Sequence, residues 1–188
     1  MTTDRRLVAA ATVLLDSGGE EAVTLRAVAQ ASDVSHNAPY KHFEDRDALL
    51  AAVATADLQM LQDTLRGLRE SSAAAQTKLM KGIRMMLEFN REHPARYGLV
   101  FGNRKIATAG GDVKRVAVGT FGEFAQIVKE CQDAKVLPVG PTATVASLLF
   151  ATMHGLISME ATGGLHSEKG LTDVESALKA WLELVAPR

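Results

Sequence analysis

Apolar residues recur at three- and four-residue spacings along most of this 188-residue chain, which is the pattern of helices with one buried face. No segment shows the alternation of apolar and polar residues that predicts a strand. We therefore expect an all-α fold of about nine helices. The expected helices span residues 4–17, 25–31, a short one from 35, then 45–69, 72–93, 94–101, 112–134, 142–162 and a last one from 172.

Glycine, proline and capping residues set the expected ends of these helices. Gly18–Gly19 end the first helix, and Pro94 stops the fifth. Asp45 is expected to cap the fourth helix, and Thr172–Glu175 has the spacing of a capping box. Residues 102–111 are expected to form a mobile loop.

The stretch from Thr24 to Phe43 contains two short predicted helices joined by a turn. Thr24 and Ser35 lie where N-cap residues belong, and Val34 fits the angle between the helices. Two helices crossing over such a turn describe a helix-turn-helix, whose second helix enters the DNA major groove. Many small helical hairpins share this spacing, so the pattern leaves two interpretations open: a DNA reader and a plain helical corner.

The residues in this stretch resemble the DNA-binding domain of the TetR family of bacterial transcription regulators. The resemblance is carried by Thr24, Val34–Ser35, Tyr40–Phe43 and Asp45–Asp47, and it covers roughly residues 5–55. One departure is Pro39, where many relatives carry Leu or another apolar residue. Because Pro lacks an N–H, it is expected to leave the fold intact while affecting the shape of the recognition helix.

The resemblance also implies which side chains contact DNA. His36, Asn37 and Lys41 are expected nearest the base edges. Ser35, Tyr40 and His42 are expected at phosphates, while the alternatives are a packing role for Tyr40 and a helix-end hydrogen bond for His42. The predicted DNA-binding set is Thr24, Arg26, Ser35, His36, Asn37, Tyr40, Lys41, His42 and Arg46.

Charge does not support DNA binding by itself. Residues 1–47 hold five basic and eight acidic side chains, a net charge of −3, whereas a DNA-binding face is expected to be positive. Residues 34–43, however, carry Lys41 and two histidines without any acid. Arg5 and Arg6 at the start of the first helix either reach a phosphate or are solvated. The DNA-binding prediction therefore rests on the motif.

Residues 1–46 are predicted to be the helix-turn-helix DNA-binding domain, and 47–188 a helical bundle for ligand binding and dimerisation. The second half resembles the regulatory domain of a TetR subgroup at residues 93–97 and 153–163, although Met153 replaces the subgroup's usual Trp. The helix 142–162 is apolar nearly all round, so a second chain is expected to cover it, and the alternative is an intramolecular core alone. The predicted dimer interface is Val145, Leu149, Leu156, Leu178, Trp181, Leu182 and Val185.

Bulky and flexible side chains on the bundle helices predict a small-molecule cavity, although a well-packed core would show the same composition. Because these side chains carry almost no charge, the expected effector is apolar or aromatic. Gly119 and Gly122 permit either the close approach of another helix or room for a ligand. The predicted ligand-binding set is Leu61, Leu65, Met86, Phe89, Tyr97, Phe101, Phe121, Phe124, Met153 and His154.

Other features argue against catalysis. The five histidines are scattered without metal-ligand spacing, so we expect no metal and no cofactor. His154 is more consistent with a buried structural histidine than with a catalyst. The basic residues of the fifth helix, Lys78, Lys81, Arg84 and Arg91, are interpreted as a solvated face. The single cysteine, Cys131, and the absence of a signal peptide or membrane span predict a cytoplasmic protein that is not an enzyme.

The sequence thus predicts a homodimeric transcriptional regulator that binds a palindromic double-stranded DNA operator. A ligand-responsive repressor is the preferred interpretation. The alternatives are an activator, a regulator that needs no ligand, and a helical small-molecule-binding protein without DNA function.

Overall fold

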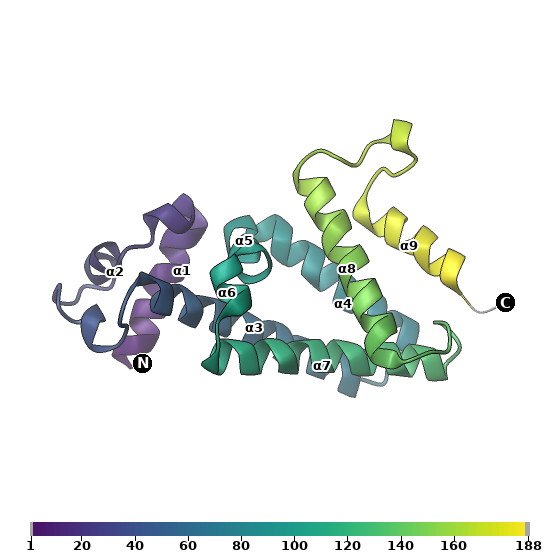
Figure 1. Ribbon diagram of the computed structural model, residues 1–188, viewed down its shortest axis with the longest axis horizontal. Coiled ribbons are helices and arrows are strands. Elements are labelled where there is room, and N and C mark those ends of the chain that lie inside the picture. The colour runs from purple at the N-terminus through teal and green to yellow at the C-terminus, as the bar shows by residue number, and fades with distance from the viewer. Residues whose placement is uncertain (1, 187–188) are drawn as a thin grey trace. The chain divides into compact units, whose positions relative to one another are not determined.

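The computed structural model describes residues 2–186, which form nine α-helices and two short 3₁₀ helices (Figure 1). Those residues contain no strand, so the predicted all-α fold is confirmed. The helices are α1 (Thr3–Ala22), α2 (Leu25–Ala31), η1 (Pro39–Lys41), α3 (Arg46–Glu70), α4 (Ala75–Glu92), α5 (Pro94–Gly102), α6 (Arg104–Thr108), α7 (Gly111–Asp133), α8 (Thr142–Ala161), η2 (Ser167–Lys169) and α9 (Val174–Val185).

The chain forms two compact units, and α3, α4 and α7 each run through both. The first unit comprises residues 1–63 and 89–120, and the second comprises 64–88 and 121–188. In the first unit, α1, α3, α5 and α7 share one apolar core. The N-terminal helices therefore do not fold around a core of their own. Fully buried members of this shared core include Leu7, Leu15, Leu49, Val53 and Leu99.

Helix α1 changes direction at Gly19, which has the positive φ of 69° that glycine adopts readily. The prediction that glycines end this helix is therefore correct in position, although a last helical turn continues to Ala22. Asp45 caps α3, because its carboxylate accepts a hydrogen bond of 2.8 Å from the amide of Ala48. At α9 the cap is Asp173, one residue after the predicted Thr172.

Residues 102–111, predicted to be a loop, contain the short helix α6. The side chain of Asn103 accepts hydrogen bonds from the amides of Lys105 and Ile106, at 2.9 and 3.3 Å. Ile106 is buried in the core of the first unit, which holds the helix in place. The loop prediction is therefore wrong because an N-cap and one buried side chain stabilise this helical turn.

A charged network joins three helices of the first unit. Arg96 on α5 forms a two-bond ion pair with Asp57 on α3, in which its Nε lies 3.1 Å from the Asp57 carboxylate. Arg96 also lies 3.6 Å from Asp16 on α1, and His93 lies 3.3 Å from the same carboxylate. The side chains of Arg96 and Asp57 are only 13% and 4% exposed. The network therefore fixes the C-terminal half of α1 to α5.

Helices α3 and α7 approach closely where they cross in the first unit. A side chain at Gly119 would meet the amide group of Gln62, which lies at the flexible end of that side chain and can move aside. The hydroxyl of Thr120 donates a hydrogen bond of 3.1 Å to the carbonyl of Leu58. Of the two roles considered for Gly119, the structure supports the close approach of a helix.

In the second unit, Lys78 on α4 is buried, with 8% exposure, so its assignment to a solvated face is wrong. Its ammonium group donates to the carbonyl of Arg69 at 2.6 Å and to the carboxylate of Glu130 at 2.8 Å. Arg66 and Arg69 both pair with Glu123 on α7, at 3.0 and 2.7 Å. These bonds join the end of α3, α4 and α7.

Candidate functional site

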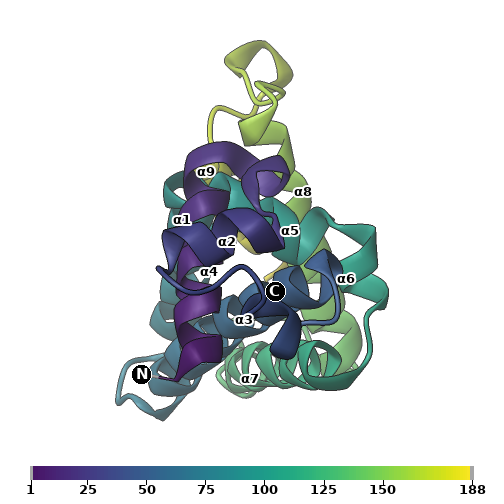
Figure 2. The same cartoon turned by 90° about the vertical axis from the view of Figure 1, so that its left-hand side faces the viewer.

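The predicted helix-turn-helix begins with α2, which packs across α1 (Figure 2). The Thr24 hydroxyl accepts a hydrogen bond of 3.1 Å from the amide of Ala27, which confirms Thr24 as an N-cap. Asp33 in the following turn has a φ of 52°, a conformation that Asp tolerates better than most residues. Val34 is partly buried against the core of the first unit, as expected of the apolar residue in this turn.

The second helix differs from the prediction. No α-helix begins at Ser35; residues 35–38 form turns, and Pro39–Lys41 form a single 3₁₀ turn. Three of the backbone bonds here span three residues: Ala38 to Ser35, Lys41 to Ala38, and His42 to Pro39. Pro39 cannot donate the amide bond that an α-helix requires, and Ser, His and Asn have low helix propensity. The N-cap prediction for Ser35 is therefore wrong.

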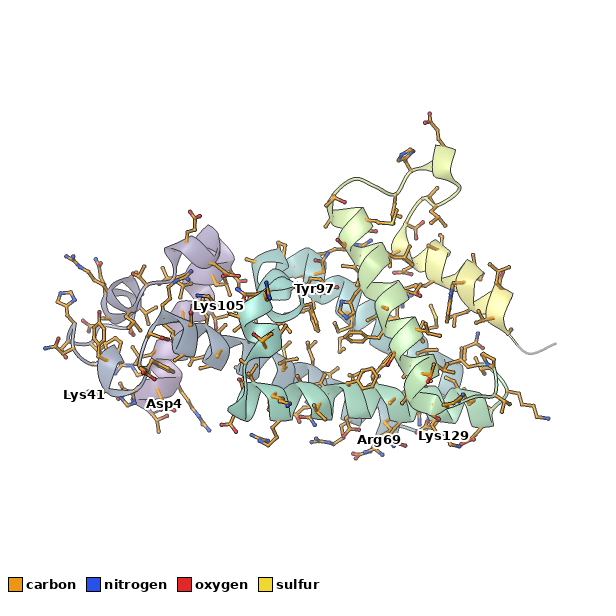
Figure 3. The ribbon with its side chains drawn as sticks, viewed as in Figure 1. Asp4, Lys41, Arg69, Tyr97, Lys105 and Lys129 are labelled. Carbon is orange, nitrogen blue, oxygen red and sulfur yellow. The ribbon has the colours of Figure 1, made fainter. Side chains whose placement is uncertain are left out.

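Most of the predicted DNA contacts are nevertheless at the surface. Tyr40 is 60% exposed, an unusual position for a large aromatic side chain that only packs a core. Lys41 projects from the 3₁₀ turn, as Figure 3 shows. The polar side chains of residues 33–44 thus lie at the surface, while Pro39 is buried and Val34 and Phe43 pack against the core. The exposed members of the predicted set are Thr24, Arg26, Ser35, His36, Asn37, Tyr40, Lys41 and His42.

Two arginines hold the helices on either side of residues 33–44 through bonds to backbone carbonyl groups. Arg6 on α1 donates a hydrogen bond of 2.6 Å to the carbonyl of Ser32, at the end of α2. Arg46 donates to the carbonyl of Val23 at 2.7 Å and also to that of Glu20. Arg46 was predicted to belong to the DNA-binding set, and Arg6 to contact phosphate or solvent. Both bind carbonyl groups at or next to the C-terminal ends of helices, where a cation is stabilised by the helix dipole, and their contact with DNA stays a prediction.

We predict that Arg46→Ala lowers the free energy of unfolding by about 1–3 kcal/mol, because two charge-assisted hydrogen bonds are lost. Arg26→Ala, at an exposed position on α2, is the matched control and is expected to change it by less than about 0.5 kcal/mol. Urea denaturation measures both. Equal midpoints for the two variants would contradict a structural role for Arg46.

The predicted ligand-binding residues divide between the two units. Leu61, Phe89, Tyr97 and Phe101 belong to the first, where the ring of Tyr97 lies 6.3 Å from Phe89 and 4.9 Å from Phe101. Burial raises the pKa of Tyr97 above its usual range. Arg96 lies over the Phe89 ring, 5.5 Å from its centre, so this aromatic row adjoins the charged network.

The second unit contains an aromatic cluster made by α7 and α8. Phe150 lies 5.8 Å from Phe121, 6.2 Å from Phe124 and 4.1 Å from the ring of His154. Phe150 was not in the predicted set, although it lies one helical turn before His154 on the same apolar helix. Met153 is buried on the same helix. The remaining predicted members in this unit are Leu65 and Met86, both buried.

Two family models match the sequence. Residues 7–53 match "Bacterial regulatory proteins, tetR family", and residues 79–184, more than half of the chain, match "Tetracyclin repressor-like, C-terminal domain". The chain belongs to the TetR family. The resemblance predicted from residues 5–55 is thereby confirmed, and the protein is a DNA-binding transcriptional regulator. No match is found among curated proteins.

Solved structures similar to this TetR-family chain span nearly all of its length. A protein of unknown function from Rhodococcus sp. RHA1 is 29% identical with a TM-score of 0.80, covering 98% of this chain and 94% of its own. The fatty acid degradation regulator FadR from Bacillus halodurans is 13% identical with a TM-score of 0.72, covering 99% and 95%. RolR in complex with resorcinol is 16% identical with a TM-score of 0.70, covering 99% and 88%.

The predicted dimer residues of this TetR-family member are mostly used within the chain. Leu149, Leu156, Leu178 and Leu182 are buried by the packing of the second unit, in which α8 contacts α9. Val145, Trp181 and Val185 are half-buried. A different face of α8 is exposed, and its members are Thr144, Ser147, Leu148, Ala151, Gly155, Ser158 and Met159.

Helix α8 is also long and apolar enough to cross a membrane, the one such helix among residues 2–186. A single helix of this kind is weak evidence for a membrane span, because the core helix of a soluble protein passes the same test.

We predict that His154 makes the stability of this regulator sensitive to acid. Burial lowers the pKa of His154 to about 4, below the ordinary value near 6.5, so the folded protein holds the neutral ring. The unfolded chain therefore binds more protons as the pH falls from 6.5 towards 4, and stability is lost over that range. At pH 5 the loss is expected to be about 1–2 kcal/mol.

The measurement compares unfolding free energies at pH 7 and pH 5 for the wild type and His154→Leu. The variant is expected to lose about 1–2 kcal/mol less than the wild type over this range. An identical pH dependence for the two proteins would show that His154 is protonated equally well in both states.

Proposed function

We propose that the protein is a ligand-responsive repressor that binds a palindromic operator as a homodimer. In this proposal, residues 1–46 read DNA, and residues 47–188 bind the effector and form the dimer. The observation that carries it is the acid-free segment 34–43, whose polar side chains and Tyr40 are exposed, after the capped helix α2 and within a TetR-family domain. Tyr40 and Lys41 are the proposed principal contacts, with His36 and Asn37 near the bases.

The proposed effector is apolar or aromatic. The cluster of Phe121, Phe124, Phe150 and His154 supports this proposal, because it offers ring faces and a neutral imidazole rather than charge. RolR binds resorcinol, an aromatic ligand. FadR regulates the degradation of fatty acids, which carry apolar chains. An effector that binds more tightly to the conformation with low DNA affinity needs a coupling free energy of only ~1–3 kcal/mol.

The proposed dimer uses the exposed face of α8 rather than the residues predicted from sequence. Leu148 is 59% exposed and Met159 is 39% exposed, while the residues between them on this face are small. Small residues permit two copies of the helix to approach closely around a two-fold axis. Leu184 on α9 is 85% exposed and is a further candidate.

The test begins with sheared duplex DNA from the protein's native genome, from which bound fragments are recovered and sequenced. The proposal predicts enrichment of fragments that share an inverted repeat, with binding that weakens steeply as salt increases. A reporter fused to the enriched promoter should become more active when the gene is deleted, whereas an activator would give the reverse. Failure to enrich any fragment at low ionic strength would overturn the proposal.

A further inference from the structure

The start of α6 binds two carboxylates, one on each side of the helix-turn-helix. The helix-turn-helix occupies residues 24–43, so the last turn of α1 precedes it and the first turn of α3 follows it. The side-chain amide of Asn103 donates hydrogen bonds of 3.0 and 2.9 Å to the two carboxylate oxygens of Glu20 on α1. The ammonium group of Lys105, labelled in Figure 3, lies 2.5 Å from the carboxylate of Asp47 on α3. One short helix, distant in sequence, therefore contacts both flanks of the motif.

Asn103 uses both ends of its side-chain amide group in this arrangement. Its oxygen caps α6 by accepting hydrogen bonds from the amides of Lys105 and Ile106, which leaves its nitrogen to donate to Glu20. Glu20 is also bound through its backbone, because its carbonyl accepts a hydrogen bond from Arg46. Glu20 therefore connects the start of α6 with the start of α3.

Polar bonds carry much of the attachment between α6 and α3. A cavity of about 220 Å³ lies between the two helices, where α3 presents the small side chains of Ala48 and Ala51. Within residues 104–108, Ile106 is the one buried side chain. Because the apolar contact between these helices is incomplete, the bonds of Asn103 and Lys105 are expected to decide how firmly α6 holds the two flanks.

Both polar groups are matched within the chain, Asn103 by Glu20 and Lys105 by Asp47, which fits a positioning role rather than contact with DNA. We propose that Asn103 and Lys105 are positioning residues of the helix-turn-helix. By holding the turns before and after the motif, they reduce the conformational freedom that it loses on binding DNA. The proposal rests on the DNA binding of this regulator and adds two residues outside the matched segment 7–53.

The positioning role is tested first without DNA, by hydrogen exchange followed by mass spectrometry of the full chain. Asn103→Asp keeps an oxygen that caps α6, but it places a carboxylate against that of Glu20. We expect amide exchange in residues 24–43 and in the first turn of α3 to become at least about threefold faster. Thermal unfolding checks that the variant is folded. Unchanged exchange in the folded variant would overturn the proposal.

Exchanging donor and acceptor supplies the matched rescue. Glu20→Gln alone keeps a hydrogen bond, because the amide of Asn103 can donate to the remaining side-chain carbonyl. Combined with Asn103→Asp, the same substitution supplies an amide that donates to the new carboxylate, and the net charge equals that of the wild type. Exchange in the double variant should return to within about twofold of the wild type. Exchange as fast as in Asn103→Asp alone would contradict the direct contact.

Operator affinity is then measured on the fragment enriched from the native genome. Failure of the wild type to bind any fragment contradicts the proposed function, whereas the exchange result stands without DNA. Asn103→Asp and Lys105→Gln should each weaken binding about three- to tenfold, since both chains of a dimer lose the bond. Lys105→Arg keeps the ion pair and should bind within about twofold of the wild type.

The dependence of binding on salt separates positioning from direct contact. Lys105→Gln should leave the slope of log affinity against log salt unchanged, because a residue paired within the chain releases no counterion from DNA. A smaller slope would identify a phosphate contact and refute the positioning role of Lys105. Glu20→Gln alone should change affinity by less than about twofold. A gain equal to the loss in Asn103→Asp would show that net charge, rather than the bond, sets the affinity.

Lys129→Gln is the matched control for Lys105→Gln. Lys129 forms an ion pair with Asp133 on α7 in the second unit, and these side chains are 50% and 64% exposed. The control removes the same charge from an exposed pair and should change neither operator affinity nor exchange in residues 24–43 by more than about twofold. Equal effects of the two substitutions would contradict the role of Lys105.

Discussion

Arg96→Met is expected to lower the free energy of unfolding by about 3–5 kcal/mol, the cost of leaving a buried charge without its partner. Asp57 is 3% exposed in the first unit, and Arg96 supplies both hydrogen bonds of its ion pair. The same substitution removes the cation above Phe89 and the contact with Asp16. Urea denaturation at pH 7 measures the loss, which is a large part of a typical domain's stability.

Three further variants define the cause of that loss. Asp57→Leu combined with Arg96→Met should recover most of it, because the buried charge is gone. Arg96→Lys keeps the charge but loses the two-bond geometry, so about 1 kcal/mol is expected. Arg115→Ala breaks a pair with Asp112 in which both side chains are exposed, and should change stability by less than about 1 kcal/mol. A cost for Arg96→Met no larger than that for Arg115→Ala would contradict the buried pair.

Tyr40→Ala combined with Lys41→Ala is expected to reduce affinity for the enriched operator by at least about a hundredfold. Each lost contact costs about 1–3 kcal/mol, and a dimer loses each contact twice. Lys41→Ala alone should also reduce the dependence of binding on salt, because fewer counterions are released. Fluorescence anisotropy with the labelled operator at several salt concentrations measures both effects.

The control for this pair is Lys81→Ala, at an exposed position on α4. It removes the same charge from elsewhere on the chain and should change affinity by less than about twofold. Because Tyr40 is 60% exposed, the unfolding free energy of the double variant should stay within about 0.5 kcal/mol of the wild type. Unchanged operator affinity in the folded double variant would refute the proposed contacts.

The helices were predictable because their signals are local. Apolar spacing placed α3, α4, α7 and α8, and Gly19, Thr24 and Asp45 marked ends that the structure confirms. The recognition segment was harder, because the family pattern implies a helix whereas Pro39 removes a bond that this helix needs. The local signal for a broken helix was Pro39 together with the low helix propensity of Ser35, His36 and Asn37 before it.

The ion pairs could not be located from sequence, because their partners are far apart along the chain. Asp57 did give a signal, since it interrupts the buried stripe of α3 and a carboxylate there requires a partner. Nothing local identified Arg96 as that partner, 39 residues away. Lys78 was misassigned for the same reason, because its bonds to Arg69 and Glu130 come from other helices.

The exposed face of α8 shows a further limit. An apolar helix reveals that all its sides need cover, but not which side its own chain covers. Leu149 and Leu156 were predicted to meet a second chain, yet the second unit buries them itself. The proposed interface therefore moves to the face of Leu148 and Met159.

The most direct test of the account is hydroxyl-radical footprinting of the protein on the DNA fragment recovered from its own genome. If each chain of the dimer supplies one recognition segment, two protected half-sites related by inverted symmetry are expected. Their centres should lie about one helical turn (~34 Å) or a multiple apart. Two chains should bind each site. A single asymmetric footprint made by one chain, or no protection at low ionic strength, would contradict it.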